Sequence, residues 1–582
     1  MSTQRLPGES ERQRIMRRYG ELKAVRAQWD PHIQDIAENI LPRRLRLNPQ
    51  GEINRGSKLN GKLLDPEPLH ALRTLAAGLM ASITSPARQW LRLTTQDPEL
   101  AAWGPVKQYL HEVEVRLSRI YSMSNFYQAL SDGVYPDIGA FGTACMGIEE
   151  DPKRVLNCVS MPWGEYFLAC NGGGEVDTCY REIPFTVRQV VTKFCQDGNL
   201  SRLSSSVKSA YSRGSYEDVV LVIHAIEPND DFSGDMIGPR GMRWSSVWIE
   251  KGAEEGKFLR KSGFNEFPIV APRWSVTGTD VYGRGPGMEC LPDARELQFE
   301  TSRRGQLSDK ITDPPMKASP TLRGSRATLI PGDVTYLPEG QNAVFEPSYV
   351  VKPEAMSENR QTRAELKSAI RSHFFADLWM RILNDDRLQR ATAEEIREGK
   401  EELMLQLGPV LEHLNPELLR PSIDIGFAIG LRMNLFPEPP EEIQGQELQA
   451  EFISILHQAQ KATGLVAIRT LWGEAAKIAQ FKPAVMDKLE ADATIDEIAD
   501  IVGVNPKLVL DDEGVARVRQ VRAQQELEKA QAQEAASMVQ GAAALGKTPA
   551  PGPDNALGAL LGTMGPMATA GLGQAGGLPS ET

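Results

Sequence analysis

Apolar residues at three- and four-residue spacing predict that helices form most of this chain. The two longest predicted helices cover about residues 292–310 and 354–383. The second has a polar start at residues 357–361 and an apolar stripe over its C-terminal half, so one end should pack in protein and the other should meet solvent or a neighbouring subunit. The stripe consists of Leu366, Ile370, Phe374, Leu378 and Ile382. At 1.5 Å per residue this helix would span about 45 Å.

A turn-rich, basic segment separates the two long helices. It opens on Asp313-Pro314-Pro315 and continues through Gly324, Gly332 and Gly340. A chain that follows one long helix, makes a compact excursion and returns on another can form a wall. Repeated around a symmetry axis, that wall becomes a tube.

The remaining pattern divides the chain into an α+β part and a helical part. In the first 280 residues, helices are predicted at 9–40 (interrupted at Pro31), 66–84, 105–122, 125–138 and 186–194. Short segments bounded by Gly, Pro and Asn predict strands at 143–149, 156–160, 166–169 and 177–182, and further strands are predicted at 219–225, 245–250 and 267–274. Further helices are predicted at 392–407, 416–435, 447–463, 467–480, 483–489, 495–502 and 513–538. Residues 541–582, rich in Gly, Ala, Pro and Met, are predicted to be disordered.

Composition narrows the class of protein. A chain of 582 residues is too long for one core, and two to four domains are expected. The net charge of −12 and the pI of about 5.4 argue against a nucleic-acid binder of the basic-patch kind. Six cysteines without a CxxC pair indicate reduced thiols in a cytosolic setting. Neither a signal peptide nor a membrane-spanning run of 18 apolar residues is present.

No motif for catalysis stands out. The string Tyr282-Gly283-Arg284-Gly285-Pro286-Gly287 lacks the GK[ST] ending of a phosphate loop, so a tight turn into the first long helix is the better interpretation. Neither a GxSxG elbow nor an HExxH pair occurs. Asp385-Asp386 could bind a divalent cation, although a solvated turn is favoured. We therefore predict no catalytic residue, no metal site and no cofactor.

Two groups of basic residues permit two interpretations each. Lys310, Lys317, Arg323 and Arg326 belong either to a solvated loop or to a docking surface for an acidic partner. The group Arg381, Arg387 and Arg390 is either a helix C-terminus with favourable cations or a loop that reaches into a channel. The residues alone favour the first interpretation in both cases.

Several strings in a fixed order resemble one family. They are Ala76–Leu79 with Ser85–Leu93 (SPARQWLRL), Asp137–Ala144 (DIGAFGTA), Pro162–Tyr166 (PWGEY), Asp177–Arg181, Thr186–Val190, Gly283–Asp293, Asp313–Pro315 and Thr392–Glu395. Together they resemble the podovirus head-to-tail connector proteins, also called portal proteins. The resemblance covers about residues 10–525, and the Gly/Ala-rich tail departs from it.

The resemblance implies an α+β, mostly α-helical portal fold that assembles as a ring, usually of twelve subunits. Its parts would be an α+β wing, a helical stem, a small α/β clip and a helical crown. By order along the chain they are wing 1–284, first stem helix 285–312, clip 313–353, second stem helix 354–383, tunnel loop 384–391, wing return 392–440, crown 441–540 and the tail 541–582.

The resemblance also implies a non-enzymatic function. A portal ring sits at one vertex of the capsid in the virion, having been assembled in the host cytoplasm. It passes double-stranded DNA without sequence preference during packaging and ejection. Its expected partners are copies of itself, terminase, the tail adaptor and tail proteins, and capsid and scaffold proteins, with no membrane.

Two sets of site residues follow from the resemblance. The tunnel loop would place Asn384, Asp385, Asp386, Arg387 and Arg390 at the DNA channel. The clip would use Lys317, Arg323 and Arg326 to dock terminase or the tail adaptor. The alternatives are another phage assembly protein, such as a scaffold or internal core protein, and a cytosolic enzyme with an unrecognised site.

Overall fold

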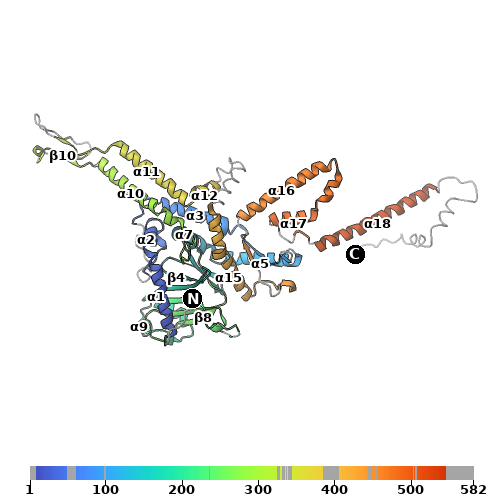
Figure 1. Cartoon of the computed structure of the whole chain (residues 1–582), viewed down its shortest axis with the longest axis horizontal. Helices are drawn as coiled ribbons and strands as arrows, with labels where there is room; N and C mark the ends of the chain where they lie inside the picture. The colour runs from blue at the N-terminus through green and yellow to red at the C-terminus, as the bar shows by residue number, and fades with distance from the viewer. Residues whose placement is uncertain are drawn as a thin grey trace, which may run out of the picture. The chain divides into compact units, whose positions relative to one another are not determined.

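The computed structural model of the chain describes residues 8–48, 61–97, 100–101, 103–234, 236, 238–323, 328–330, 334–335, 337, 344–383, 406–443, 449–452, 455–502, 504, 508–510 and 512–545. The chain forms two compact units, residues 1–494 and 495–582. The first unit contains all the strands of the described part and most of the helices (Figure 1).

The α-helices are α1 (Glu11–Ala27), α2 (Asp30–Asn39), α3 (Glu67–Ile83), α5 (Gly104–Met123), α6 (Phe126–Ala129), α7 (Tyr135–Phe141), α8 (Val187–Phe194), α9 (Ser205–Ser212), α10 (Pro286–Thr312), α11 (Pro353–His373), α12 (Ala376–Leu383), α15 (Arg420–Arg432), α16 (Ile455–Ala479), α17 (Ala491–Val502) and α18 (Asp512–Leu545). Residues 406–414 are also helical. Two π-helical turns, η3 (Leu130–Val134) and η7 (Asn415–Leu419), lie within longer helical runs. Short 3-10 turns are η1 (Pro42–Arg44), η4 (Leu200–Arg202), η5 (Pro239–Gly241), η6 (Pro320–Leu322), η8 (Glu441–Ile443) and η9 (Pro483–Lys488).

The strands are β1 (Leu91–Thr94), β2 (Cys145–Asp151), β3 (Val155–Met161), β4 (Tyr166–Cys170), β5 (Val176–Thr186), β6 (Val219–Pro228), β7 (Trp244–Glu250), β8 (Arg260–Phe264), β9 (Ile269–Val270), β10 (Met316–Ala318), β11 (Phe345–Pro347) and β12 (Gln449–Phe452). They form four antiparallel sheets with the orders β4-β5-β6-β7-β8, β3-β2-β9, β1-β12 and β10-β11.

The five-stranded sheet has an apolar core on each face. Alternate residues of a strand point to opposite faces, so Ile223 and Ala225 of β6 pack in the cluster that contains Ile15, Tyr19 and Leu22 of α1. Val222 and Trp248 pack on the other face with residues of α8 and α9. A capping box between Ser10 and Gln13 starts α1 and so fixes where that helix begins on the sheet.

The largest core joins the three-stranded sheet to α2, α3, α5, α7, α10, α12 and α15. Its largest fully buried side chains include Trp163, Tyr121 and Phe126. This core holds the N-terminal half of α10 and the C-terminal part of α11 with α12, because Leu291, Leu297, Ile370 and Phe374 all belong to it.

The glycine-rich string before α10 acts as a tight turn. Gly142 ends α7 with φ +74°, and a Cβ placed there would lie 2.5 Å from the backbone nitrogen of Gly285. Gly287 likewise lies against the backbone of Ala140. Only glycine permits such close backbone contact, so the interpretation of residues 282–287 as the start of the long helix is confirmed.

The first long helix is longer than the pattern indicates. Its predicted start at Pro292 is wrong, because α10 begins at Pro286 and continues through Pro292. Pro292 lies inside this helix at an exposed position.

The second long helix is broken, whereas the sequence predicts one helix over 354–383. The break separates α11 from α12 at Phe374 and Phe375, and Phe375 has φ +54°. Both rings serve packing, since Phe374 is fully buried and Phe375 stacks on Trp274 with 6.3 Å between ring centroids. Tertiary packing thus overrides a continuous helical pattern.

Three other predictions are wrong in detail. The helix of 125–138 continues through η3 and ends at Gly142 rather than Gly139. The strand of 267–274 is reduced to Ile269–Val270, since Pro268 and Pro272 flank it and proline cannot donate to a sheet. The helix predicted at 447–463 begins with β12, and its remainder joins the next predicted helix as α16 through Gly464.

Some elements are shorter, longer or unpredicted. The sequence pattern does not predict β1, β8 or α9, and α18 extends to Leu545, into the segment predicted to be disordered. The predicted helix of 416–435 is divided into η7 and α15. Residues 384–405 and 546–582 lie outside the described residues.

Candidate functional site

The most distinctive feature of the first unit is an antiparallel hairpin made by α10 and α11 (Figure 1). His373 contacts Asp293 and, farther from the core, Asn359 contacts Glu300, so the order of contacts runs in opposite directions along the two helices. Each helix is buried at its base and exposed at its outer half. We refer to residues 299–312 and 354–365 as the outer halves of the hairpin.

The seam of the hairpin changes from apolar to polar with distance from the core. At the base, Leu291, Ala294 and Leu297 of α10 belong to the same core as Ile370 of α11. Farther out, the Asn359 amide donates to the backbone oxygen of Glu300 at 3.2 Å and to its carboxylate at 2.5 Å. Hydrogen bonds depend on direction, so this part of the seam fixes the register of the two helices.

A buried carboxylate clamps the base of the hairpin to the segment before α3. Asp65 is 4% exposed, and its Oδ2 atom lies 2.9 Å from Nζ of Lys367 and accepts a 3.1 Å hydrogen bond from Arg363. The side chain of Gln298 in α10 accepts from the backbone nitrogens of Leu64 and Asp65 and donates to the Asp65 carbonyl at 3.0 Å. Both hairpin helices are therefore tied to one short segment.

The charge of this carboxylate is stabilised by its partners. Burial acts to raise the pKa of Asp65, but hydrogen bonds from Lys367, the Glu67 backbone amide and Arg363 outweigh it and lower the pKa below its ordinary value. Asp65 is therefore ionised at neutral pH and holds two cations of α11. We refer to Asp65 and its partners Gln298, Arg363 and Lys367 as the Asp65 clamp.

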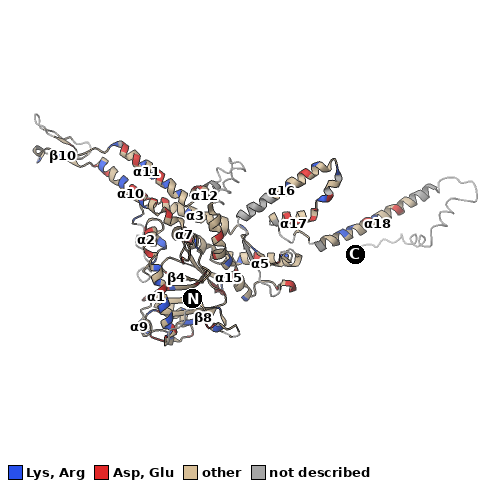
Figure 2. Ribbon diagram, in the orientation of Figure 1, with Lys and Arg blue, Asp and Glu red and all other residues tan. Residues whose placement is uncertain are grey.

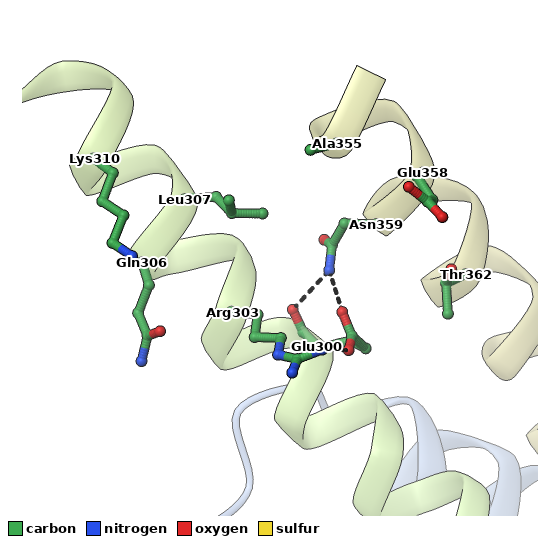
Figure 3. Close-up of a pocket in the computed structure, with 9 residues that line it drawn as sticks. All are labelled: Glu300, Arg303, Gln306, Leu307, Lys310, Ala355, Glu358, Asn359 and Thr362. Carbon is green, nitrogen blue, oxygen red and sulfur yellow. Dashed lines mark hydrogen bonds and ion pairs between the residues drawn. The ribbon is translucent and has the colours of Figure 1, made fainter. Parts of the chain in front are cut away.

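A groove of about 480 Å³ opens between the outer halves of the two helices (Figure 3). It is lined by Glu300, Arg303, Gln306, Leu307, Lys310, Ala355, Glu358, Asn359 and Thr362. Charged and amide groups dominate this lining. The groove resembles a polar protein–protein contact more than a pocket for a small apolar ligand.

The tip of the hairpin holds the two-stranded sheet of β10 and β11. Lys317 pairs with Glu346 across this sheet, and the two charged groups lie 2.7 Å apart. Large apolar side chains near the tip are exposed, among them Leu329, Ile330, Val334 and Val350. An isolated two-stranded sheet is marginally stable in water, so this tip is suited to association with another surface.

The helix that follows the break is fixed tightly. Trp379 of α12 is buried, and its ring lies directly over Gly78 of α3, where a Cβ atom would overlap it. This contact packs α12, which ends at Leu383, against α3.

The structure describes part of the residue sets expected from the sequence. Lys317 lies in β10 with its side chain more than half exposed, and Arg323 is exposed directly after η6. Arg326 and the set Asn384, Asp385, Asp386, Arg387 and Arg390 lie outside the described residues. Within the described residues, no group of three or more His, Cys, Asp or Glu is arranged to hold a metal ion.

Sequence reasoning missed the residues that fix the hairpin. Asp65, Gln298 and Asn359 are polar residues without a motif, and their partners are distant in the chain. The one local signal is Asp65-Pro66 before a helical pattern, which is typical of a helix start. That signal says nothing about the contacts with α10 and α11.

Comparison with known proteins gives one family model, "Bacteriophage head to tail connecting protein", which matches residues 12–510. The chain belongs to this family. The portal protein of Salmonella phage epsilon15 is 41% identical to this connector-family chain over 546 residues, which cover 93% of this chain and 95% of the relative. The probable portal protein of Bordetella phage BPP-1 is 38% identical over 535 residues, which cover 92% and 94%.

Chains of solved structures also match this member of the connector family. A chain from the "Neck of empty GTA particle computed with C6 symmetry" superposes with a TM-score of 0.34 at 12% identity and covers 72% of this chain and 87% of its own length. An overlap this low does not bear on the fold. Separately, none of the described helices has the length and apolar character needed to cross a membrane.

Proposed function

We propose that this chain is a portal subunit, copies of which close into a ring at one vertex of a phage capsid. The ring would pass double-stranded DNA during packaging and ejection, without sequence preference. The observation that carries this proposal is the 41% identity to a portal protein over nearly the full length of both chains. A hairpin with exposed outer halves is consistent with it, because a subunit of a ring must keep surface free for its neighbours.

In this proposal each region of the chain has a part in the ring. Residues 1–284 and 392–440 form the wing, α10 and α11 with α12 form the stem, residues 313–353 form the clip, and residues 441–540 form the crown. The segment Asn384–Arg390 is the tunnel loop. The polar seam and the Asp65 clamp would keep each stem hairpin at a fixed angle to its wing.

The proposed partners follow from the same function. They are eleven further copies of the chain, terminase during packaging, the tail adaptor and tail proteins, and capsid and scaffold proteins. The ring would be assembled in the host cytoplasm and would reside in the virion. The chain itself would be a structural component, with DNA movement driven by another protein.

Measuring the mass and the shape of the purified assembly tests this function. Twelve chains of 64.2 kDa give about 770 kDa, which native mass spectrometry can resolve from rings of eleven or thirteen. Negative-stain images should show rings with an axial hole. A chain that stays a single subunit at high concentration contradicts the proposal.

The docking role of the tip gives a separate prediction. Reversing the charge of Lys317, Arg323 and Arg326 should weaken attachment of the tail adaptor, because like charges then face each other at the contact. Lys317 also pairs with Glu346, so Glu346→Ala serves as the control for loss of that pair alone. Co-sedimentation of adaptor with rings is the measurement, and normal binding by the triple variant contradicts the role.

A further inference from the structure

The outer halves of the hairpin carry opposite charges. In α10, the exposed charged residues of 299–312 are Arg303, Arg304 and Lys310 against Asp309. In α11, the exposed charged residues of 354–365 are Glu354, Glu358 and Glu365 against Arg360. Figure 2 shows Lys and Arg near the outer end of α10, and both acidic and basic residues along α11.

Opposite charges on the two helices lie at the same height of the hairpin. Asn359 contacts Glu300 and so defines the level at which α11 faces α10. At 1.5 Å per residue, Arg303 and Arg304 are about 5 to 6 Å farther out along α10. Glu358 and Glu354 lie about 1.5 to 7.5 Å farther out along α11, which covers the same interval.

Among the described residues, these charges form no ion pair from one helix of the hairpin to the other. Arg303 pairs with Glu300 of its own helix at 2.9 Å, and Lys310 lies 5.7 Å from the ring centre of Tyr349. In the part of the chain that the structure describes, no ion pair joins Arg303, Arg304 or Lys310 to Glu354, Glu358 or Glu365. The groove separates the two sets, with Arg303 and Lys310 on one side and Glu358 on the other (Figure 3).

We propose that the basic outer half of α10 in one copy pairs with the acidic outer half of α11 in the next copy. This inference rests on the proposed ring, in which every contact is head-to-tail, so that one side of each subunit meets the opposite side of its neighbour. A hairpin whose outer halves expose mostly basic residues on α10 and mostly acidic residues on α11 presents opposite charges at each such contact. The same arrangement makes every contact between two like helices repulsive, which selects one direction of closure.

Two charge-reversal variants test the pairing. The first is Arg303→Glu with Arg304→Glu, and the second is Glu354→Arg with Glu358→Arg. In either variant alone, all neighbouring hairpins carry like charges, so the protein concentration needed for half-maximal ring formation should rise roughly tenfold or more. The loss should shrink at high salt, because exposed charges are screened.

Mixing the two variants provides the decisive test of the pairing. In a ring where they alternate, each contact again joins a basic helix to an acidic one, so an equimolar mixture should form rings at close to the wild-type concentration. Native mass spectrometry should find equal numbers of both variants in each ring. Recovery on mixing also shows that both variants are folded.

The control is Arg213→Glu with Arg240→Glu, which changes the net charge by the same amount as the first variant at exposed positions after α9 and in η5. It should form rings like wild type. Variants that each assemble normally, or a mixture that fails although both have wild-type circular dichroism, overturn the pairing while the ring itself stands. A wild-type chain that forms no ring overturns the proposed function and the pairing together.

Discussion

At the scale of single residues, His224 is the clearest buried titratable group. Its ring stacks on Trp248 with 3.7 Å between ring centres, and its Nε2 atom lies 2.9 Å from the Ser246 hydroxyl. Burial, followed by the nearby cations Arg181, Lys193 and Arg260, lowers the pKa of His224 well below its ordinary value of 6.5. The folded protein therefore keeps this imidazole neutral.

This residue predicts a pH dependence of stability. The unfolded chain binds a proton at His224 below pH 6.5 and the folded chain does not, so the stability that the neutral imidazole provides is present above pH 6.5 and is lost as the pH falls below it. The loss should approach about 1.4 kcal/mol per pH unit for one proton. Urea unfolding between pH 7 and pH 5 measures it.

The His224→Phe variant keeps a ring against Trp248. It should reduce the pH slope of the unfolding free energy by the contribution of one proton. His70→Ala, at an exposed position of α3, is the control and should leave the slope unchanged. Equal slopes in wild type and His224→Phe would show that another group is responsible.

Two glycines of helices give opposite predictions for one substitution. At Gly78 a Cβ atom would overlap the ring of Trp379, whereas at Gly20 nothing lies within 4 Å. Gly78→Ala should therefore destabilise the chain by about 1–3 kcal/mol through overpacking. Gly20→Ala should stabilise it by about 0.5–1 kcal/mol, because alanine favours the helix. Thermal unfolding of the two variants measures both effects, and changes of the same sign would contradict the packing of α12 on α3.

At the scale of elements, the hairpin depends on its anchoring more than on its helical pattern. The outer half of α10 is exposed, so its position is set by the seam, the clamp and the core at its base. Helix propensity makes these segments helical, but it does not decide where they stand relative to the sheet.

The Asp65 clamp gives the prediction at this scale. Asp65→Ala removes the shared acceptor of Arg363 and Lys367 and should lower the free energy of unfolding by about 1.5–3 kcal/mol. Glu67→Ala removes more exposed contacts to Lys367 and Arg371 and should cost less than about 1 kcal/mol. Hydrogen exchange should show faster opening at the base of α10 and α11 in Asp65→Ala. Unchanged exchange there would mean that the clamp does not hold the hairpin.

At the scale of the whole molecule, the final helix α18 belongs to the second compact unit. The second compact unit begins at residue 495, and the described side chains of α18 from 516 to 538 are exposed. We predict that deletion of residues 541–582 leaves ring assembly intact, because it removes only the last five residues of α18 from the described part of the chain. Negative-stain images of the truncated protein provide the measurement, and loss of rings would assign the deleted segment a role in assembly.

Local sequence patterns predicted many of the helices and strands, and they also indicated the family. The apolar run of β6 and the apolar spacing of α3 and α5 are local patterns, and they correctly predicted a strand and two helices. The ordered strings between residues 10 and 525 agree with the family match over residues 12–510. Such patterns can be recognised because strand and helix periods are set by neighbouring residues.

Tertiary structure alone decided the break at Phe375, the pairing of β1 with β12 and the Asp65 clamp. Leu91 pairs with Phe452, and Asp65 accepts a hydrogen bond from Arg363. The partners are far apart in the chain, so the helix and strand periods cannot predict these contacts. Phe375 fits a helical stripe by spacing, yet it leaves the helix to stack on Trp274. Each of these segments buries its side chains against segments that are distant in the chain. Which surfaces come into contact therefore depends on the packing of the complete core.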